Sequence, residues 1–178
     1  VRGQPLDYDT WAQLGNRGGS YEAVLPYFRK AERFEGPAGE ARGRDGLLNV
    51  AEMYESHELC DAFIGAAEAM GYPRNPDYNS GDQEGFGYYQ VTQLDGKRHS
   101  TARAFLDPAR GRDNLHIVTG ALTSRILLDG KRAVGVRYAA HGEHFDVTAR
   151  LEVVVACGAV QSPGLLERSG IGQPELLR

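Results

Sequence analysis

The clearest hydrophobic pattern lies in residues 151–172, LEVVVACGAVQSPGLLERSGIG. Its apolar run over residues 153–156 lacks the polar alternation of a half-solvated strand and is typical of a strand covered on both faces. Gly158 ends the run, and the pair Ser162-Pro163 predicts a helix start with the serine as N-cap. A buried strand, a tight turn and a capped helix suit ligand binding at the carboxyl edge of a parallel sheet. The same pattern also fits a strand–helix crossover that binds nothing.

Three extended segments precede this stretch, at residues 120–128, 133–140 and 145–149. An Asp-Gly pair and a His-Gly pair separate them, and both pairs are turn signals. The spacing predicts an antiparallel meander that leads the chain into the buried run. A further strand is predicted at residues 115–118.

Two helices are predicted near the beginning of the chain. Residues 8–14 carry apolar side chains at helical spacing, with Asp7 or Asp9 as the N-cap. Residues 21–31 follow the N-cap Ser20 and end in basic side chains, which complement the helix dipole.

Residues 52–70 show the longest helical pattern, an apolar stripe that Gly71 ends. Cys60 borders the stripe and is expected to pack as a small apolar residue. The glycine- and charge-rich residues 35–49 predict an exposed loop that leads into a short strand at residues 47–50. The stripe consists of Leu59, Phe63, Ala66, Ala67 and Met70.

Residues 72–85 predict a loop by composition, and the loose alternation of residues 86–93 predicts a strand. The aromatic side chains of this region fit two interpretations, the lining of a substrate cavity or the outer face of a sheet that stacks on a neighbour. Residues 98–106 then predict a short capped helix, closed by an Asp-Pro pair. The aromatic cluster comprises Tyr72, Tyr78, Phe86, Tyr88 and Tyr89.

Composition narrows the possible functions. The chain has 178 residues, enough for one domain or parts of two, and a net charge of −4. Its basic residues are scattered, so neither nucleic acid nor an anionic membrane is expected as a partner. No apolar run approaches the ~20 residues of a membrane span. Cys60 and Cys157 lie far apart, which favours a reduced, cytoplasmic setting and leaves a disulfide as the alternative.

The sequence offers no catalytic constellation. His141 and His144 lack a third ligand nearby, so no metal is expected. Neither a Ser/His/Asp order nor a GxxxxGK[ST] or GxGxxG motif is present. The chain begins VRGQPLDYD, without an initiating methionine, which predicts a piece of something longer. The residues alone therefore predict an α/β chain, with α+β elements, whose sheet edge either binds a ligand or forms a plain crossover.

Residues 158–172, GAVQSPGLLERSGIG, resemble the second signature of the glucose–methanol–choline (GMC) oxidoreductases, which carries Ser-Pro after its opening glycine and ends in Ser-Gly-Ile-Gly. The pair Arg2-Gly3 is similar to the tail of the first signature. Segments at residues 7–11 and 100–106 are similar to the choline- and alcohol-dehydrogenase branch, so the resemblance runs along the whole chain.

The resemblance implies a Rossmann-like flavoprotein that binds FAD and oxidises a small-molecule alcohol to an aldehyde, with hydride passing to the flavin. It implies FAD-domain-associated helices in residues 1–35 and part of a substrate-binding domain in residues 36–95. Residues 96–178 are then the part of the FAD-binding domain with the meander, buried strand and helix. The catalytic histidine pair is expected beyond Arg178 and the GxGxxG before Val1, in the missing parts of the same enzyme.

The cofactor-binding residues follow by matching positions. The small residues 156–158 let the backbone approach FAD closely. Thr123 stands where the family commonly has a valine on the adenine side of FAD. Arg2 and Gly3 are expected to neighbour the flavin loop. The implied cofactor-binding residues are Arg2, Gly3, Thr123, Ala156, Cys157 and Gly158.

Two alternatives stay open. The family also contains flavin-dependent lyases and a photodecarboxylase, which keep the fold and change the chemistry. The second alternative is that the 178-residue chain by itself is a catalytically inactive fragment. Losing the first βαβ unit would leave parallel strands with exposed edges and uncovered apolar faces.

Overall fold

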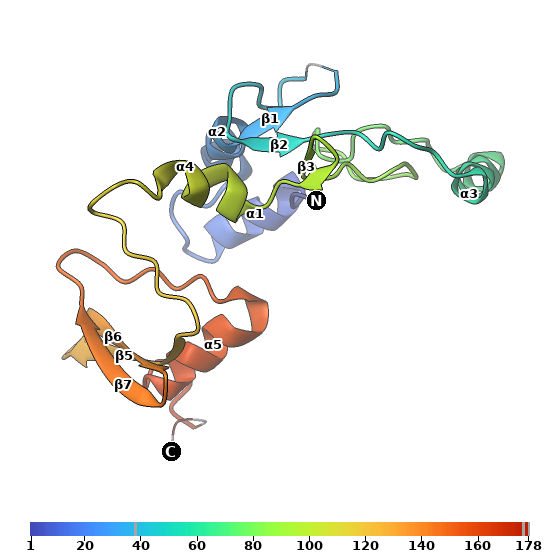
Figure 1. Cartoon of the computed structure of the whole chain (residues 1–178). Coiled ribbons are helices and arrows are strands. Elements are labelled where there is room, and N and C mark those ends of the chain that lie inside the picture. Colours follow the sequence, from blue (N-terminus) through green and yellow to red (C-terminus); the bar gives the residue numbers. More distant parts are fainter. Residues whose placement is uncertain (38, 176, 178) are drawn as a thin grey trace. The chain divides into compact units, whose positions relative to one another are not determined.

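The computed structural model describes residues 1–37, 39–175 and 177. It forms two compact units, Val1–Leu115 and His116–Arg178. Helices and strands occur in both units, which confirms the mixed α/β composition (Figure 1). The division at residues 35 and 95 concerns the domains of a complete enzyme and stays a prediction.

The first unit begins with helices α1 (Pro5–Gln13) and α2 (Tyr21–Ala31). The bounds of α2 and its Ser20 cap confirm the prediction, with Ser20 Oγ accepting from the Ala23 amide. The predicted cap of α1 is wrong. Gln4 is the N-cap, and Asp7 instead accepts from the Gln4 amide at 2.7 Å within the first turn. Asp9 accepts from the Tyr21 amide and so joins the two helices.

Strands β1 (Glu32–Phe34) and β2 (Leu48–Val50) pair in parallel. The sequence predicted β2 and missed β1, because three residues directly after a helix carry no alternation of their own. The loop between the strands is not wholly exposed, contrary to the prediction. Ala41 and Arg42 are buried there, because Arg42 pairs with the buried Glu32.

Helix α3 (Glu58–Ala69) begins six residues later than predicted, at the N-cap His57. It lies at the end of two extended segments of the first unit (Figure 1). Of the predicted stripe, Ala67 is buried and Leu59, Phe63 and Met70 are exposed, so most of the stripe does not pack. Ile64, beside the stripe, is also buried. Cys60 is also exposed, so its predicted packing is wrong.

Strands β3 (Gln93–Leu94) and β4 (Lys97–Arg98) form a hairpin, and both of its turn residues have positive φ. The strand predicted at residues 86–93 is mostly wrong: these residues make two isolated bridges, and only β3 is regular. The π-helical segment η1 (Ala102–Leu106) runs on into α4 (Asp107–Ala109). The Asp-Pro pair therefore starts a helical turn rather than closing one, as the first turn tolerates proline.

In the second unit, β5 (Leu122–Asp129), β6 (Arg132–Ala140) and β7 (Glu143–Thr148) form the predicted antiparallel meander in the order β5-β6-β7. The strand predicted at residues 115–118 is wrong, since that segment is irregular. The turn signals placed the meander correctly because each acts between neighbouring strands.

Helix α5 (Gly158–Arg168) begins earlier than predicted, with Cys157 rather than Ser162 at the N-cap. The predicted buried strand at residues 153–156 is also wrong: the segment is irregular, and Val154 is 77% exposed. A parallel strand needs a neighbour to complete its ladder, and within the described part of the chain none lies beside this segment.

Candidate functional site

The start of α5 is the most distinctive local geometry among the predicted site residues. Gly158 has a φ of +84°, in the left-handed region that side chains with a Cβ disfavour. A Cβ added to it would meet nothing within 4 Å in the described structure, so the backbone conformation alone calls for glycine. The amide of Cys157 donates to Ser162 Oγ at 3.0 Å, so a side chain from inside the helix holds the turn.

The electrostatics of this helix start suit an anion. Across its described residues, α5 has no acidic side chain in its first turn, and Arg168 lies in its last. The first amides of a helix lack intrahelical acceptors and carry a partial positive charge. Ala156 and Cys157 are exposed and small, so a ligand can reach their backbone. The small residues at this turn thus fit the close backbone approach to FAD that the resemblance implies.

Thr123 lies at the beginning of β5, opposite Tyr138 of β6 and next to an irregularity in the ladder. The C-terminal end of α5 is anchored to the same strand. The Ile126 amide donates to Ser169 Oγ at 2.8 Å, and Arg168 Nε donates to the carbonyl of Ser124 at 3.4 Å. Because α5 has 11 residues, its ends lie about 16 Å apart. Thr123 and Cys157 are therefore at opposite ends of this helix.

Arg2 and Gly3 belong to the first unit, where both are held firmly. The Arg2 guanidinium donates to Glu32 Oε2 at 2.7 Å and to the Ala41 carbonyl at 2.6 Å, and it lies over the Phe28 ring. The Gly3 amide donates to the Tyr8 hydroxyl at 3.1 Å. The guanidinium of Arg2 and the amides of both residues are thus bonded to other groups of the protein, which fixes the position of this segment in the first unit.

A buried charge network, which sequence reasoning missed, surrounds Arg2. Arg42 is 3% exposed; its Nη2 lies 3.0 Å from Glu32 Oε1, and its Nη1 donates to Asp77 and Gln90. Burial lowers the pKa of Arg42, and the charges of Glu32 and Asp77 act in the opposite direction. Asn79 closes the network by accepting from the Arg2 amide at 2.8 Å and donating to Gln90.

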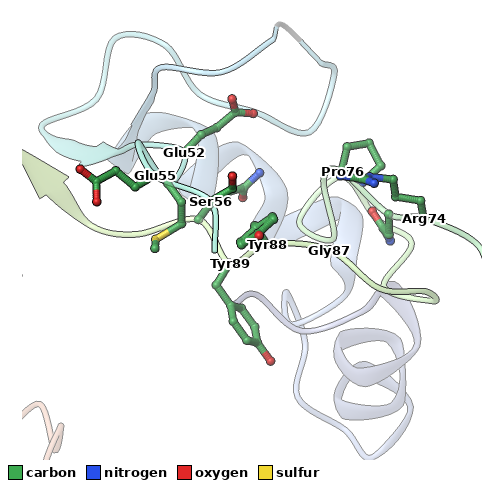
Figure 2. A pocket seen from close by; sticks show the side chains of 11 residues that line it. Glu52, Glu55, Ser56, Arg74, Pro76, Gly87, Tyr88 and Tyr89 are labelled. Atoms are coloured by element: carbon green, nitrogen blue, oxygen red, sulfur yellow. The ribbon is translucent and has the colours of Figure 1, made fainter. Parts of the chain in front are cut away.

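A cavity of about 200 Å³ lies beside the aromatic cluster. Glu52, Glu55 and Ser56 line one side and Arg74 the other, with Tyr88 between them (Figure 2). Because Tyr88 and Tyr89 line this cavity and residues 86–90 form no strand in the described structure, the sheet-face interpretation of the cluster is wrong.

The phenol of Tyr88 is fixed by its neighbours. Its hydroxyl donates to Asp61 Oδ1 at 2.8 Å and accepts from the His57 amide at 3.1 Å. Desolvation is the main cause that raises the pKa of Tyr88. The group therefore stays protonated at neutral pH and orients the ring rather than acting as a base.

Other chemistry is limited in the described residues. They contain no group of three or more His, Cys, Asp or Glu side chains that could hold a metal ion. Cys60 and Cys157 are free thiols. Within the same residues, no helix combines the length and apolar character needed to cross a bilayer.

The chain belongs to the GMC oxidoreductase family, whose model matches residues 1–176. It is similar to solved structures of the same kind. A pyridoxine 4-oxidase from Mesorbium loti matches with a TM-score of 0.86 and 32% identity over 99% of this chain and 35% of that one. An FAD-dependent oxidoreductase from Chaetomium thermophilum matches with a TM-score of 0.87 and 32% identity over 99% of this chain and 33% of the other.

The curated relatives point to one branch of the family. An oxygen-dependent choline dehydrogenase of Xanthomonas euvesicatoria pv. vesicatoria (strain 85-10) is 49% identical over 183 residues, covering 100% of this chain and 33% of the relative. The mitochondrial choline dehydrogenase of Homo sapiens is 44% identical over 178 residues, covering 100% of this chain and 30% of the relative. The chain thus spans about a third of the length of the curated relatives that it matches.

Proposed function

We propose that the protein is an FAD-dependent oxidoreductase that oxidises the CH–OH group of a small alcohol to an aldehyde, with choline as the first substrate to test. One observation carries this proposal: the chain is similar over its whole length to choline dehydrogenases of a bacterium and of human, at 49% and 44% identity. The FAD-binding signature at the start of α5 supports the cofactor.

When bound, FAD would supply the hydride acceptor. The residues of this chain would hold it: Ala156, Cys157 and Gly158 through closely approached backbone, and Thr123 on the adenine side. The backbone of Arg2 and Gly3 would neighbour the flavin, kept in place by Glu32 and Tyr8.

The domain division belongs to the same proposal. Residues 1–35 and 96–178 would contribute to an FAD-binding domain, and residues 36–95 to a substrate-binding domain. The base that removes the hydroxyl proton would come from a part of the enzyme beyond Arg178. A reduced, cytoplasmic location is part of the same proposal, because the two cysteines lie far apart in the sequence.

The experiment uses the complete protein encoded around this sequence. It is purified, its cofactor is released and identified, and it is mixed with choline without oxygen. We expect bound FAD whose visible absorbance bleaches, with formation of an aldehyde. An FAD-containing protein that choline and other small alcohols leave oxidised would contradict the proposed reaction and favour a flavin-dependent lyase or decarboxylase of the same fold. The 178-residue chain alone is expected to be inactive, because the proposed base is not part of it.

A further inference from the structure

We propose that Ser162 is a positioning residue for the cofactor-facing turn at residues 156–158, an inference that rests on the proposed function. Ser162 lies inside α5, yet its hydroxyl oxygen reaches back to accept from the amide of Cys157, the N-cap residue, at 3.0 Å. This bond fixes the peptide that joins Ala156 to Cys157 directly before the left-handed Gly158.

The neighbouring proline makes this bond more important. Pro163 lacks an N–H, so the carbonyl of Ala159 receives no helical bond from it. The first turn of α5 is therefore held by one backbone hydrogen bond fewer than a regular helix. The Ser162 hydroxyl compensates for the missing bond, because it connects the Cys157 amide at the turn to the second turn of the helix.

The bond also selects which amides remain for a ligand. The Cys157 amide is occupied, whereas the next amides, those of Gly158, Ala159 and Val160, belong to the first turn, where a helix offers no acceptor. Ser162 thus holds in place the turn whose remaining amides would face the bound cofactor.

Ser169, the C-cap residue of α5, has a different role. It is buried at the far end of the helix, donates to the Leu165 carbonyl at 2.6 Å and accepts from the Ile126 amide of β5. Ser169 anchors the helix to the sheet. Ser162 is half-buried and makes no such contact with the sheet among the described residues, so its loss should affect the turn rather than the packing.

The test compares FAD affinity in the complete protein, stripped of cofactor and titrated with FAD. We expect Ser162→Ala to weaken FAD binding by roughly threefold to tenfold, the effect of one hydrogen bond. Ser162→Thr keeps the acceptor oxygen and should restore affinity close to wild type. Ser20→Ala is the matched control: it removes a serine that accepts a backbone amide at the start of α2, and it should leave FAD affinity unchanged.

A second readout follows the site itself. Cys157 is an exposed thiol, so FAD should slow its alkylation, measured by peptide mass spectrometry. At the lowest FAD concentration that protects the wild type, Ser162→Ala should be protected less, in line with its weaker FAD binding. If Ser162→Ala does not fold, Ser162→Thr and Ser162→Cys test the same contact. Ser162→Cys should bind FAD more weakly than Ser162→Thr, since sulfur is the weaker acceptor.

Each contrary outcome has a distinct meaning. Equal FAD affinity in Ser162→Ala and wild type, or in Ser162→Thr and Ser162→Cys, overturns the role of Ser162 alone. A wild-type protein that takes up no FAD overturns the proposed function, and the positioning role with it.

Discussion

Glu32 is the residue on which the buried charges of the first unit converge. Its Oε2 accepts from Arg2 and from the Gly43 amide at 3.0 Å, and its Oε1 lies 3.0 Å from Arg42 Nη2. No local pattern in the sequence marks Glu32 as buried. Hydrophobic periodicity shows which face of an element is apolar, but it does not show which charged side chains pair in the folded chain. The network joins residues that only the folded chain brings together, so the sequence predicted the helix before Glu32 and missed the ion pairs.

Replacing Glu32 tests the network. We expect Glu32→Gln to lower the free energy of unfolding by about 3–5 kcal/mol, because it removes the carboxylate that Arg2 and the buried Arg42 share and leaves Asp77 as the one acidic partner of Arg42 among the described residues. Urea denaturation of the protein measures the change. The matched control is Asp146→Asn, which removes an exposed carboxylate that also binds an arginine, Arg137. It should cost clearly less, because solvent screens that pair. Equal losses for the two variants would contradict the account.

The ion pair of the meander gives a pH prediction. Hydrogen bonds from Arg137 at 2.7 Å hold the pKa of Asp146 below its usual range. Its contribution to stability is therefore fully present above the unfolded-state pKa of about 3.9 and is lost as the pH falls through the lower folded-state pKa.

Urea midpoints of wild type and Asp146→Asn should then differ at neutral pH and converge in acid. The measurement is restricted to pH values at which both proteins fold. A difference that grows as the pH falls would show that Asp146 does not act through this ion pair.

The elements differ in how well the sequence predicted them, and the reason is the range of the signal. Helix α2 and the meander were predicted correctly because caps, helical spacing and turn pairs act between near neighbours. The strand predicted at residues 153–156 was wrong, because a parallel strand depends on partner strands that lie far away in the sequence. The predicted start of α5 was wrong because a Ser-Pro pair usually marks an N-cap. Here Ser162 lies within the helix, and its hydroxyl accepts from the amide of the N-cap residue Cys157.

Gly158 provides a test of the element that carries the candidate site. Gly158→Ala should destabilise the protein by about 1–2 kcal/mol, the cost of a left-handed backbone for a residue with a Cβ. Space is no obstacle, since the new Cβ meets nothing within 4 Å in the described structure.

Gly65→Ala is the matched control for this substitution. Gly65 lies within α3 and also has open space, so alanine should stabilise that helix by about 0.5–1 kcal/mol. Thermal or urea unfolding gives both values. A neutral or stabilising Gly158→Ala would contradict the turn geometry on which the candidate site depends.

For the molecule as a whole, the sequence predicted the family better than it predicted the site. The signature at residues 158–172 is contiguous, so it can be recognised from the sequence without the fold. The family match over residues 1–176 confirms the predicted family. The proposed cofactor-binding residues fall in both units, two in the first and four in the second, and the chain spans about a third of the length of its curated relatives. Local patterns report on neighbouring residues and not on contacts with a cofactor, so the FAD contacts remain proposals.

The most direct test of the central claim follows the hydrogen on the carbon that bears the hydroxyl group. The complete protein is mixed without oxygen with choline or with choline deuterated at that carbon, and the rate of flavin bleaching is compared. Oxidation of a CH–OH group predicts slower bleaching with the deuterated substrate and deuterium retained in the aldehyde. Failure of choline and of other small alcohols to reduce the flavin, or bleaching at equal rates with no aldehyde formed, would contradict the proposed reaction.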